Sequence, residues 1–125
     1  MYRFTWVHAF TTLDPLSVRV VRRGTRLHLV GLRYKWRSGP SLAVVSTVDR
    51  MLSEQEWVDL QAAVSRGFWN LPGHSKDVGF DGATWMTEGR IGSRYHLVTR
   101  WEPRLTEERS VALVLLRLAA LTLPQ

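Results

Sequence analysis

The sequence predicts an α+β fold: an antiparallel sheet of five to six strands, in the order ββββ-α-ββ-α, with two helices packed on one face. Large apolar and polar residues alternate along most of the first half, as in strands with one buried face. Near residue 53 the spacing of apolar residues changes to three and four, which is typical of a helix. The length of 125 residues, with 45% hydrophobic and 22% charged side chains, is typical of a single globular domain covering residues 1–125.

Four strands are predicted before the first helix. The first strand carries large residues at alternate positions: Tyr2, Phe4, Trp6, His8 and Phe10. A turn at Asp14-Pro15 leads into a second strand from Leu16, and Arg23-Gly24 closes a hairpin onto residues 26–36. Ser38-Gly39-Pro40 ends that third strand, and residues 42–48, rich in Val, Thr and Ser, are predicted as the fourth. Together these strands form a meander.

Two helices are predicted. Ser53-Glu54-Gln55-Glu56 is a capping box that begins a helix over Ser53–Arg66, and Gly67 supplies its left-handed stop. Thr106 is expected to cap a last helix over residues 106–121. That last helix is apolar nearly all round, so we expect it to be buried beneath the sheet or, alternatively, to form a homodimer interface.

A β-hairpin is predicted between the helices. Its strands are residues 83–88 and 94–101, and residues 89–93, which contain two glycines, are expected to form a five-residue turn. Asp81 and Trp101 are expected near one end of this hairpin, with Asp81 serving turn chemistry.

The hairpin carries the main candidate catalytic group. With a five-residue turn, Glu88 faces Arg94 and lies diagonal to His96, on the same surface as Arg100. If the protein is an enzyme, Glu88 orients His96 for acid–base chemistry and Arg94 or Arg100 holds an anionic substrate. We favour the alternative of a structural network, because the chain has no recognisable nucleophile elbow and no glycine-rich phosphate loop.

Composition argues against several classes of function. The chain has no cysteine, which excludes disulfides and thiolate chemistry. Its four histidines have no short ligand spacing, so neither a metal site nor another cofactor is expected. The first residues lack the apolar run of a signal peptide, and the longest apolar stretch, Val111–Leu123, is too short and interrupted to span a bilayer. We therefore expect a cytoplasmic protein without a membrane segment.

The whole chain has a formal net charge of +6 at pH 7, and the positive charge is concentrated in its N-terminal part. Residues 1–50 carry nine Lys and Arg against Asp14 and Asp49, whereas residues 51–125 carry eight against nine acids. This asymmetry predicts a protein partner with an acidic surface or, alternatively, nonspecific contact with RNA or single-stranded DNA. Because 15 of the 17 cations are Arg, a GC-rich genome is a further explanation of the excess.

The six tryptophans are a large share for this length, and most are expected to lie in the core. Trp36 lies among polar and aromatic residues before a Gly-Pro break, a composition typical of interface hot spots; the alternative is that it folds over the core. The predicted partner-binding surface consists of Arg22, Arg33, Tyr34, Trp36 and Arg37.

The second half carries a series of specific motifs. They are a Gly-Phe-Trp-x-Leu-Pro elbow, Asp-Gly-x-x-Trp-x-x-Glu-Gly, Tyr-His-x-Val-x-Arg-Trp-x-Pro and a leucine-rich last helix. The positions concerned are Gly67, Phe68, Trp69, Leu71, Pro72, Asp81, Gly82, Trp85, Glu88, Gly89, Tyr95, His96, Val98, Arg100, Trp101 and Pro103. In these positions the chain resembles a family of small, mostly bacterial proteins of unknown function. The resemblance covers about half of the chain and implies one α+β domain. It does not indicate any particular activity.

Three functions from different classes follow. The first is a non-catalytic protein-binding domain, most concretely a cytoplasmic immunity or antitoxin-like protein that neutralises a partner. The second is a small enzyme that acts on an anionic substrate through Glu88, His96 and Arg100. The third is nonspecific binding of RNA or single-stranded DNA, with Tyr34 and Trp36 stacking on bases. We favour the first, and expect a monomer or a homodimer through the C-terminal helix.

Overall fold

The structure is a computed structural model that describes residues 1–9, 13–38, 41–77, 79 and 81–124. It has the predicted order of four strands, a helix, two strands and a helix, with one additional turn of 3-10 helix, η1. The elements are β1 (Tyr2–His8), β2 (Leu16–Arg23), β3 (Arg26–Trp36), β4 (Leu42–Met51), α1 (Glu54–Val64), η1 (Phe68–Asn70), β5 (Ala83–Ile91), β6 (Arg94–Trp101) and α2 (Thr106–Leu118). Phe10, expected in the first strand, and the expected break at Gly39-Pro40 lie outside the described residues.

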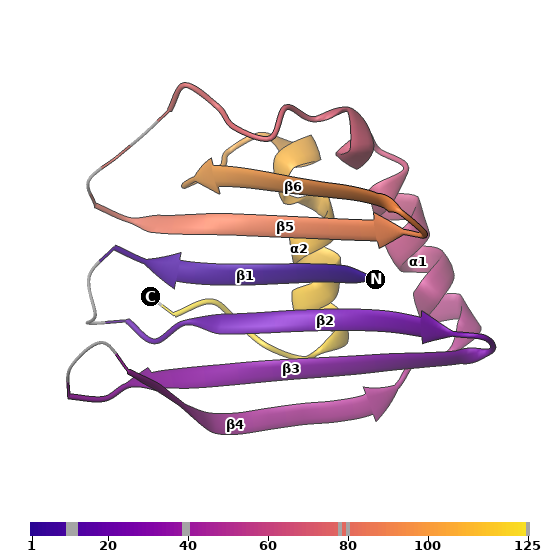
Figure 1. Ribbon diagram of the computed structural model, residues 1–125, viewed down its shortest axis with the longest axis horizontal. Helices are drawn as coiled ribbons and strands as arrows, with labels where there is room; N and C mark the ends of the chain where they lie inside the picture. Colours follow the sequence, from indigo (N-terminus) through magenta and orange to yellow (C-terminus); the bar gives the residue numbers. More distant parts are fainter. Residues whose placement is uncertain (10–12, 39–40, 78, 80, 125) are drawn as a thin grey trace.

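All six strands form one antiparallel sheet in the order β4-β3-β2-β1-β5-β6 (Figure 1). The first four strands make the predicted meander. The β5–β6 hairpin then adds to the free side of β1, so that β1 becomes a central strand. In this ladder Arg3 lies opposite Glu88, a residue 85 positions away in the sequence.

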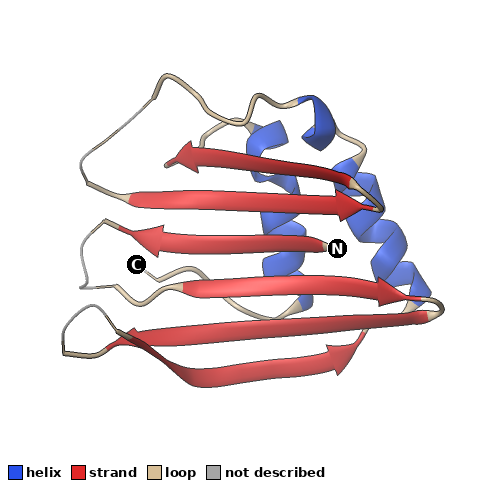
Figure 2. Cartoon of the chain, in the orientation of Figure 1, coloured by secondary structure: helices blue, strands red, loops and turns tan. Residues whose placement is uncertain are grey.

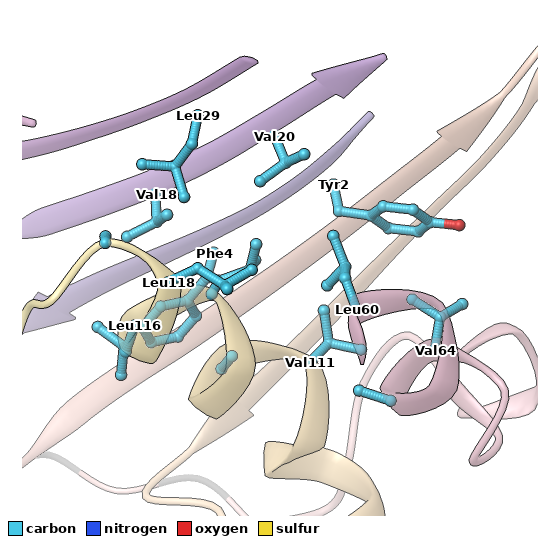
Figure 3. Close-up of a cluster of buried hydrophobic side chains, with 14 of the residues drawn as sticks. Tyr2, Phe4, Val18, Val20, Leu29, Leu60, Val64, Val111, Leu116 and Leu118 are labelled. Carbon is cyan, nitrogen blue, oxygen red and sulfur yellow. The ribbon is translucent and has the colours of Figure 1, made fainter. Parts of the chain in front are cut away.

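The two helices lie on the same face of the sheet, as predicted (Figure 2). Helix α2 packs against β1 and β2, and α1 packs against α2. The core between these layers consists of the inward-facing side chains of the central strands and the facing sides of both helices (Figure 3). Its labelled members are Tyr2, Phe4, Val18, Val20, Leu29, Leu60, Val64, Val111, Leu116 and Leu118. No described element covers the opposite face of the sheet.

Helix α1 begins at the predicted capping box. The Ser53 hydroxyl accepts from the Glu56 amide at 3.1 Å, and Glu56 Oε1 accepts from the Ser53 amide at 2.9 Å. The helix ends at Val64, slightly before the expected Arg66, and Gly67 has the expected positive φ of 113°. This agreement follows from local chemistry, because capping and glycine stops involve residues only a few positions apart.

Helix α2 departs from the prediction at both ends. Its N-cap is Leu105, and Thr106, predicted as the cap, is the first helical residue; no side chain caps this end. The helix ends at Leu118 rather than near residue 121, because Ala120 adopts a left-handed φ of 53° and the Leu121 amide donates to the Leu116 carbonyl at 3.0 Å. A left-handed residue at the end of a helix is usually glycine. Because this position is an alanine, Ala120, the sequence did not indicate that the helix ends here.

Arg50 of β4 connects the edge of the sheet to both helices. Its guanidinium donates to both carboxylate oxygens of Glu56, at 3.1 and 2.6 Å, and to the Leu118 carbonyl at 2.8 Å. The hydrogen bonds from Arg50 and from the Ser53 amide lower the pKa of Glu56 to about 2. The start of α1, the end of α2 and β4 are therefore joined at one point.

We expect Leu115→Ala to reduce the free energy of unfolding by about 2–5 kcal/mol, because Leu115 is fully buried and its removal leaves a cavity. Leu113→Ala on the same helix is the control, since Leu113 is 44% exposed. Urea titrations of both variants measure the difference. Equal losses would contradict the packing of α2 described above.

Candidate functional site

The hairpin has a different register from the predicted one. Strand β5 continues to Ile91, which pairs with Arg94, so the turn has two residues instead of five. Gly89, expected in the turn, lies in the strand, where an added Cβ would come within 2.8 Å of the Phe68 ring. The glycine therefore allows close packing against η1, and its interpretation as a turn residue was wrong.

The new register changes which residues share a face. Val98 lies opposite Thr87, and both are buried on the helix-covered side together with Arg100. Glu88 lies opposite Leu97 on the uncovered side. The expected group of Glu88, His96 and Arg100 is therefore not assembled, because the shift places the glutamate on one face and the other two residues on the opposite face.

Glu88 is held by Arg3 and Tyr95. Arg3 donates two hydrogen bonds of 2.8 Å, one to each carboxylate oxygen, and the Tyr95 hydroxyl donates a third at 2.7 Å. The hydrogen bonds from Arg3 hold the pKa of Glu88 below its usual value, and the bond to Glu88 raises the pKa of Tyr95. A carboxylate with a lowered pKa is a poor general base near neutral pH.

His96 anchors the elbow that follows α1. Its Nε2 lies 2.7 Å from the Leu71 carbonyl and, because a carbonyl can only accept, this nitrogen carries the proton. The imidazole packs edge-on against Phe68 at 5.3 Å and stacks with Trp69 at 6.1 Å between ring centres. These contacts engage the ring on several sides and give it a structural role.

Arg100 connects three segments and is only 5% exposed. It forms an ion pair with Glu108 of α2, and it donates to the Pro72 carbonyl at 2.7 Å and to the Thr99 carbonyl at 2.9 Å. A pocket of about 680 Å³ opens beside this pair. Because breaking a buried pair leaves an uncompensated charge, these contacts favour a structural role over substrate binding.

Asp81 and Trp101 meet at one end of the hairpin, as expected. The Trp101 indole nitrogen donates to the Asp81 carbonyl, and Asp81 Oδ1 accepts from the Gly82 amide at 2.7 Å. Gly82 has φ 90°, and Glu102 Oε1 accepts from the Ala83 amide at 2.5 Å. This end of the hairpin is closed by hydrogen bonds typical of a turn.

The predicted partner-binding residues lie at two separate places. Arg22 is near the end of β2, with its guanidinium 5.6 Å from the centre of the Trp57 ring. Arg33, Tyr34 and Trp36 lie at the other end of β3, and Arg37 directly follows that strand. Arg22 lies opposite Leu27 in β3, and the six residue steps from Leu27 to Arg33 span about 20 Å of extended strand. The structure does not bring Arg22 together with the others.

Side chains at the second place also have structural contacts. Arg33 donates to the Thr122 carbonyl at 2.8 Å, and the Tyr34 hydroxyl lies 3.3 Å from the Ser17 hydroxyl. The Trp36 amide donates to Asp14 Oδ1 at 3.4 Å. These contacts fix the end of β3 to β2, to the segment before β2 and to the C-terminal segment.

Two further surfaces lack a clear local signal in the sequence. One is the open edge of β4, for which the only indication in the sequence is the run of uncharged residues from 42 to 48. The other is a pocket beside Arg22, Trp57 and Arg90, which three distant segments assemble. Within the described ranges, no three His, Asp or Glu side chains gather in a way that would hold a metal ion.

Comparisons with protein-family models, with curated proteins and with solved structures find no match for this chain. Among the described residues, no helix has the length and apolar character needed to cross a membrane.

We expect Glu88→Gln to destabilise the protein by about 1–2 kcal/mol at pH 7, a modest loss because Arg3 is 40% exposed and regains water. The pKa of Glu88 is lower in the folded protein than in the unfolded chain, where it is near 4.5. Ionised Glu88 therefore stabilises the fold at pH values above about 4.5. This contribution is lost as the pH falls through the lower folded pKa. The stability difference between wild type and variant should therefore shrink in acid.

Urea unfolding at neutral and acidic pH tests this expectation. Tyr95→Phe is the control, since it removes one hydrogen bond and leaves the ion pair with Arg3 in place. A difference that stays constant with pH would show that the carboxylate charge of Glu88 contributes nothing to stability.

Proposed function

We propose that the chain is a non-catalytic protein-binding domain, most concretely a cytoplasmic immunity or antitoxin-like protein that neutralises an acidic protein partner. The observation that carries the proposal is the open edge of β4. An unpaired edge strand offers backbone donors and acceptors to which a partner strand can add.

The two edges of the sheet differ. At the β6 edge, the Thr99 amide donates to the Gly73 carbonyl at 2.8 Å, so the segment after η1 covers part of that edge. No described segment runs along β4, a strand of ten residues. Four large hydrophobic side chains of β4 are 44–52% exposed: Leu42, Val44, Val45 and Met51. The uncovered edge strand therefore exposes four large apolar side chains, whereas β6 exposes two, Tyr95 and Leu97.

The hydrogen-bond phase of β4 identifies the available backbone groups. The Leu52 amide donates to the Leu27 carbonyl at 2.8 Å, just beyond the end of β4. Hydrogen-bonded positions alternate in an antiparallel pair, so Arg50 and Val48 direct their peptide groups to β3. Thr47 and Asp49 direct theirs to the open side, where a partner strand would bond.

Charge supports an acidic partner. Strands β1 to β4 lie within residues 2–51, which contain the whole positive excess of the chain. A second copy would bring the same positive strands alongside, whereas an acidic partner gains favourable long-range attraction.

The contacts of the hairpin support binding over catalysis. Glu88, His96 and Arg100 are engaged by Arg3, Leu71 and Glu108, and they lie on two faces of the sheet. The hairpin motif resembles that of a family of small, mostly bacterial proteins of unknown function. We accordingly propose membership of that family.

We expect Thr47→Pro to abolish partner capture without unfolding the protein, because proline removes only an amide that points away from β3. Thr47→Val is the matched control, since it keeps that amide. The measurement is affinity capture with each variant from cells of the source organism, with quantitative mass spectrometry, and the melting temperatures of both variants establish that they fold.

A second pair of variants tests the charge of the partner. Val45→Glu should weaken capture of an acidic protein, whereas Val45→Lys should retain it. Support requires an identified acidic protein that is lost with Thr47→Pro and Val45→Glu and kept with both controls. Capture that is identical for all variants, or that disappears on nuclease treatment, would contradict the proposal.

A further inference from the structure

The face of the sheet turned away from both helices (Figure 1), here called the uncovered face, carries an excess of arginine. In β1 and β2 buried positions alternate with more exposed ones, so the residues between the core positions point to this face. By this alternation and by the pairing of the strands, its arginines are Arg3, Arg19, Arg23, Arg26 and Arg90. The acids that the described strands place there, Glu88 and Asp49, are already paired with Arg3 and His28. The uncovered face therefore has an uncompensated positive charge.

Two of these arginines lie side by side on neighbouring strands. Arg3 and Arg19 are directly opposite each other in the β1–β2 ladder, and like charges in that position are destabilising. Glu88 neutralises Arg3, whereas neither Arg19 nor Arg90 forms an ion pair with any described residue. Local arrangements that cost stability are expected at functional sites, so these cations indicate a site for an anion.

Two tyrosine rings lean along the uncovered face instead of standing out from it. Tyr95 of β6 pairs with Arg90, but its hydroxyl donates at 2.7 Å to Glu88, which lies diagonally across the ladder. Tyr34 of β3 reaches across β2 in the same way, with its hydroxyl 3.3 Å from that of Ser17. Tyr95 is 47% exposed, and the Arg90 guanidinium lies 5.6 Å from the centre of its ring. An aromatic surface and a cation are thus offered together.

Arg3 lies between the two rings. The pKa of Arg3 is raised, first by its hydrogen bond with Glu88 and also by the nearby oxygens of Tyr95 and Tyr34. Both hydroxyls therefore reach toward one guanidinium, although the two tyrosines belong to strands four spacings apart, or about 19 Å. Each strand from β3 to β6 contributes one side chain to a stripe, which consists of Tyr34, Arg19, Arg3, Arg90 and Tyr95 in that order.

We propose that this stripe binds single-stranded nucleic acid, independently of the protein partner proposed for the edge of β4. The arginines of the stripe bind phosphates, and Tyr34 and Tyr95 stack on bases. The combination of rings and cations favours a nucleic acid over an acidic protein surface, because every nucleotide brings both a planar base and a phosphate.

The width of the sheet favours a single strand over a duplex. Six strands span about 24 Å, whereas the major groove of a DNA duplex is about 12 Å wide, so the sheet does not enter it. Paired bases would then be out of reach of the two rings. Because every base has a flat face, stacking on them requires no particular sequence.

Fluorescence anisotropy of the full chain with a labelled oligothymidylate about 12 nucleotides long tests the proposal. The single strand should bind about tenfold or more tightly than its duplex with oligoadenylate, and its affinity should fall steeply with salt. Arg19→Gln should weaken binding and reduce the slope of log affinity against log salt by about 0.7, the loss of one phosphate contact. Arg66→Gln is the matched control, because Arg66 is exposed but follows α1 on the other side of the sheet.

A second pair of variants tests stacking. Tyr95→Leu should weaken binding about fivefold or more, whereas Tyr95→Phe should bind as tightly as the wild type. Both variants lose the hydrogen bond to Glu88, so only the aromatic ring distinguishes them. Equal losses in the two variants would show that the ring does not stack on a base, and would count against the proposal.

Other outcomes would overturn the proposal outright. They are equal affinity for the duplex, unchanged affinity and salt slope in Arg19→Gln, or a dissociation constant above about 1 mM at low salt. Competition by poly-L-glutamate as strong as that by unlabelled oligothymidylate would assign the stripe to an acidic protein instead. The comparisons of single strand, duplex and polyglutamate use the wild-type chain, so they do not depend on the folding of any variant.

Thr47→Pro should leave oligonucleotide binding unchanged, because β4 contributes no side chain to the stripe. Failure of this proposal is therefore separable from failure of the proposed protein-binding function.

Discussion

The inward faces of β1 and β2 are buried under α2, and the rest of the fold depends on this contact because the layer of α1 and α2 is the only one that the described residues place on the sheet. Helix α2 runs across the strands (Figure 1), and its 13 residues make it about 20 Å long, whereas the outer strands of a six-stranded sheet lie about 24 Å apart, before their own side chains are counted. The helical layer therefore does not reach far enough to bury both edges. Strand β6 gains a cover from the segment after η1, and β4 remains open.

Polar side chains secure the places that this narrow layer does not bury well. Arg100 joins β6 to α2 and to the segment after η1, and Arg50 joins β4 to the ends of both helices. Glu88 and Arg3 join β5 to β1 on the uncovered face. Structural contacts thus account for much of the dense group of polar residues in the hairpin, because Glu88, His96 and Arg100 each bind a segment outside it.

Local chemistry made much of the fold predictable. The meander, the capping box and Gly67 were read correctly because alternation and capping involve residues close in sequence. The hairpin register was not, since Gly89 is explained by contact with Phe68, a residue from another element. The candidate site failed with it, because placing Glu88 beside His96 required that register. The pocket next to Arg22 could not be predicted from the sequence either, because three segments that are distant in the sequence form it.

The position of β1 has a consequence for how the chain folds. Its pairing with β2 links neighbouring segments, but its other edge must wait for β5, about 80 residues later. Contacts between such distant segments slow folding, because a long loop must close before they form. During synthesis the meander therefore has two unpaired edges until the second half of the chain emerges. In the folded protein β5 pairs with the edge of β1, whereas the edge of β4 stays unpaired. The risk of aggregation through β1 is therefore transient, while that through β4 is permanent.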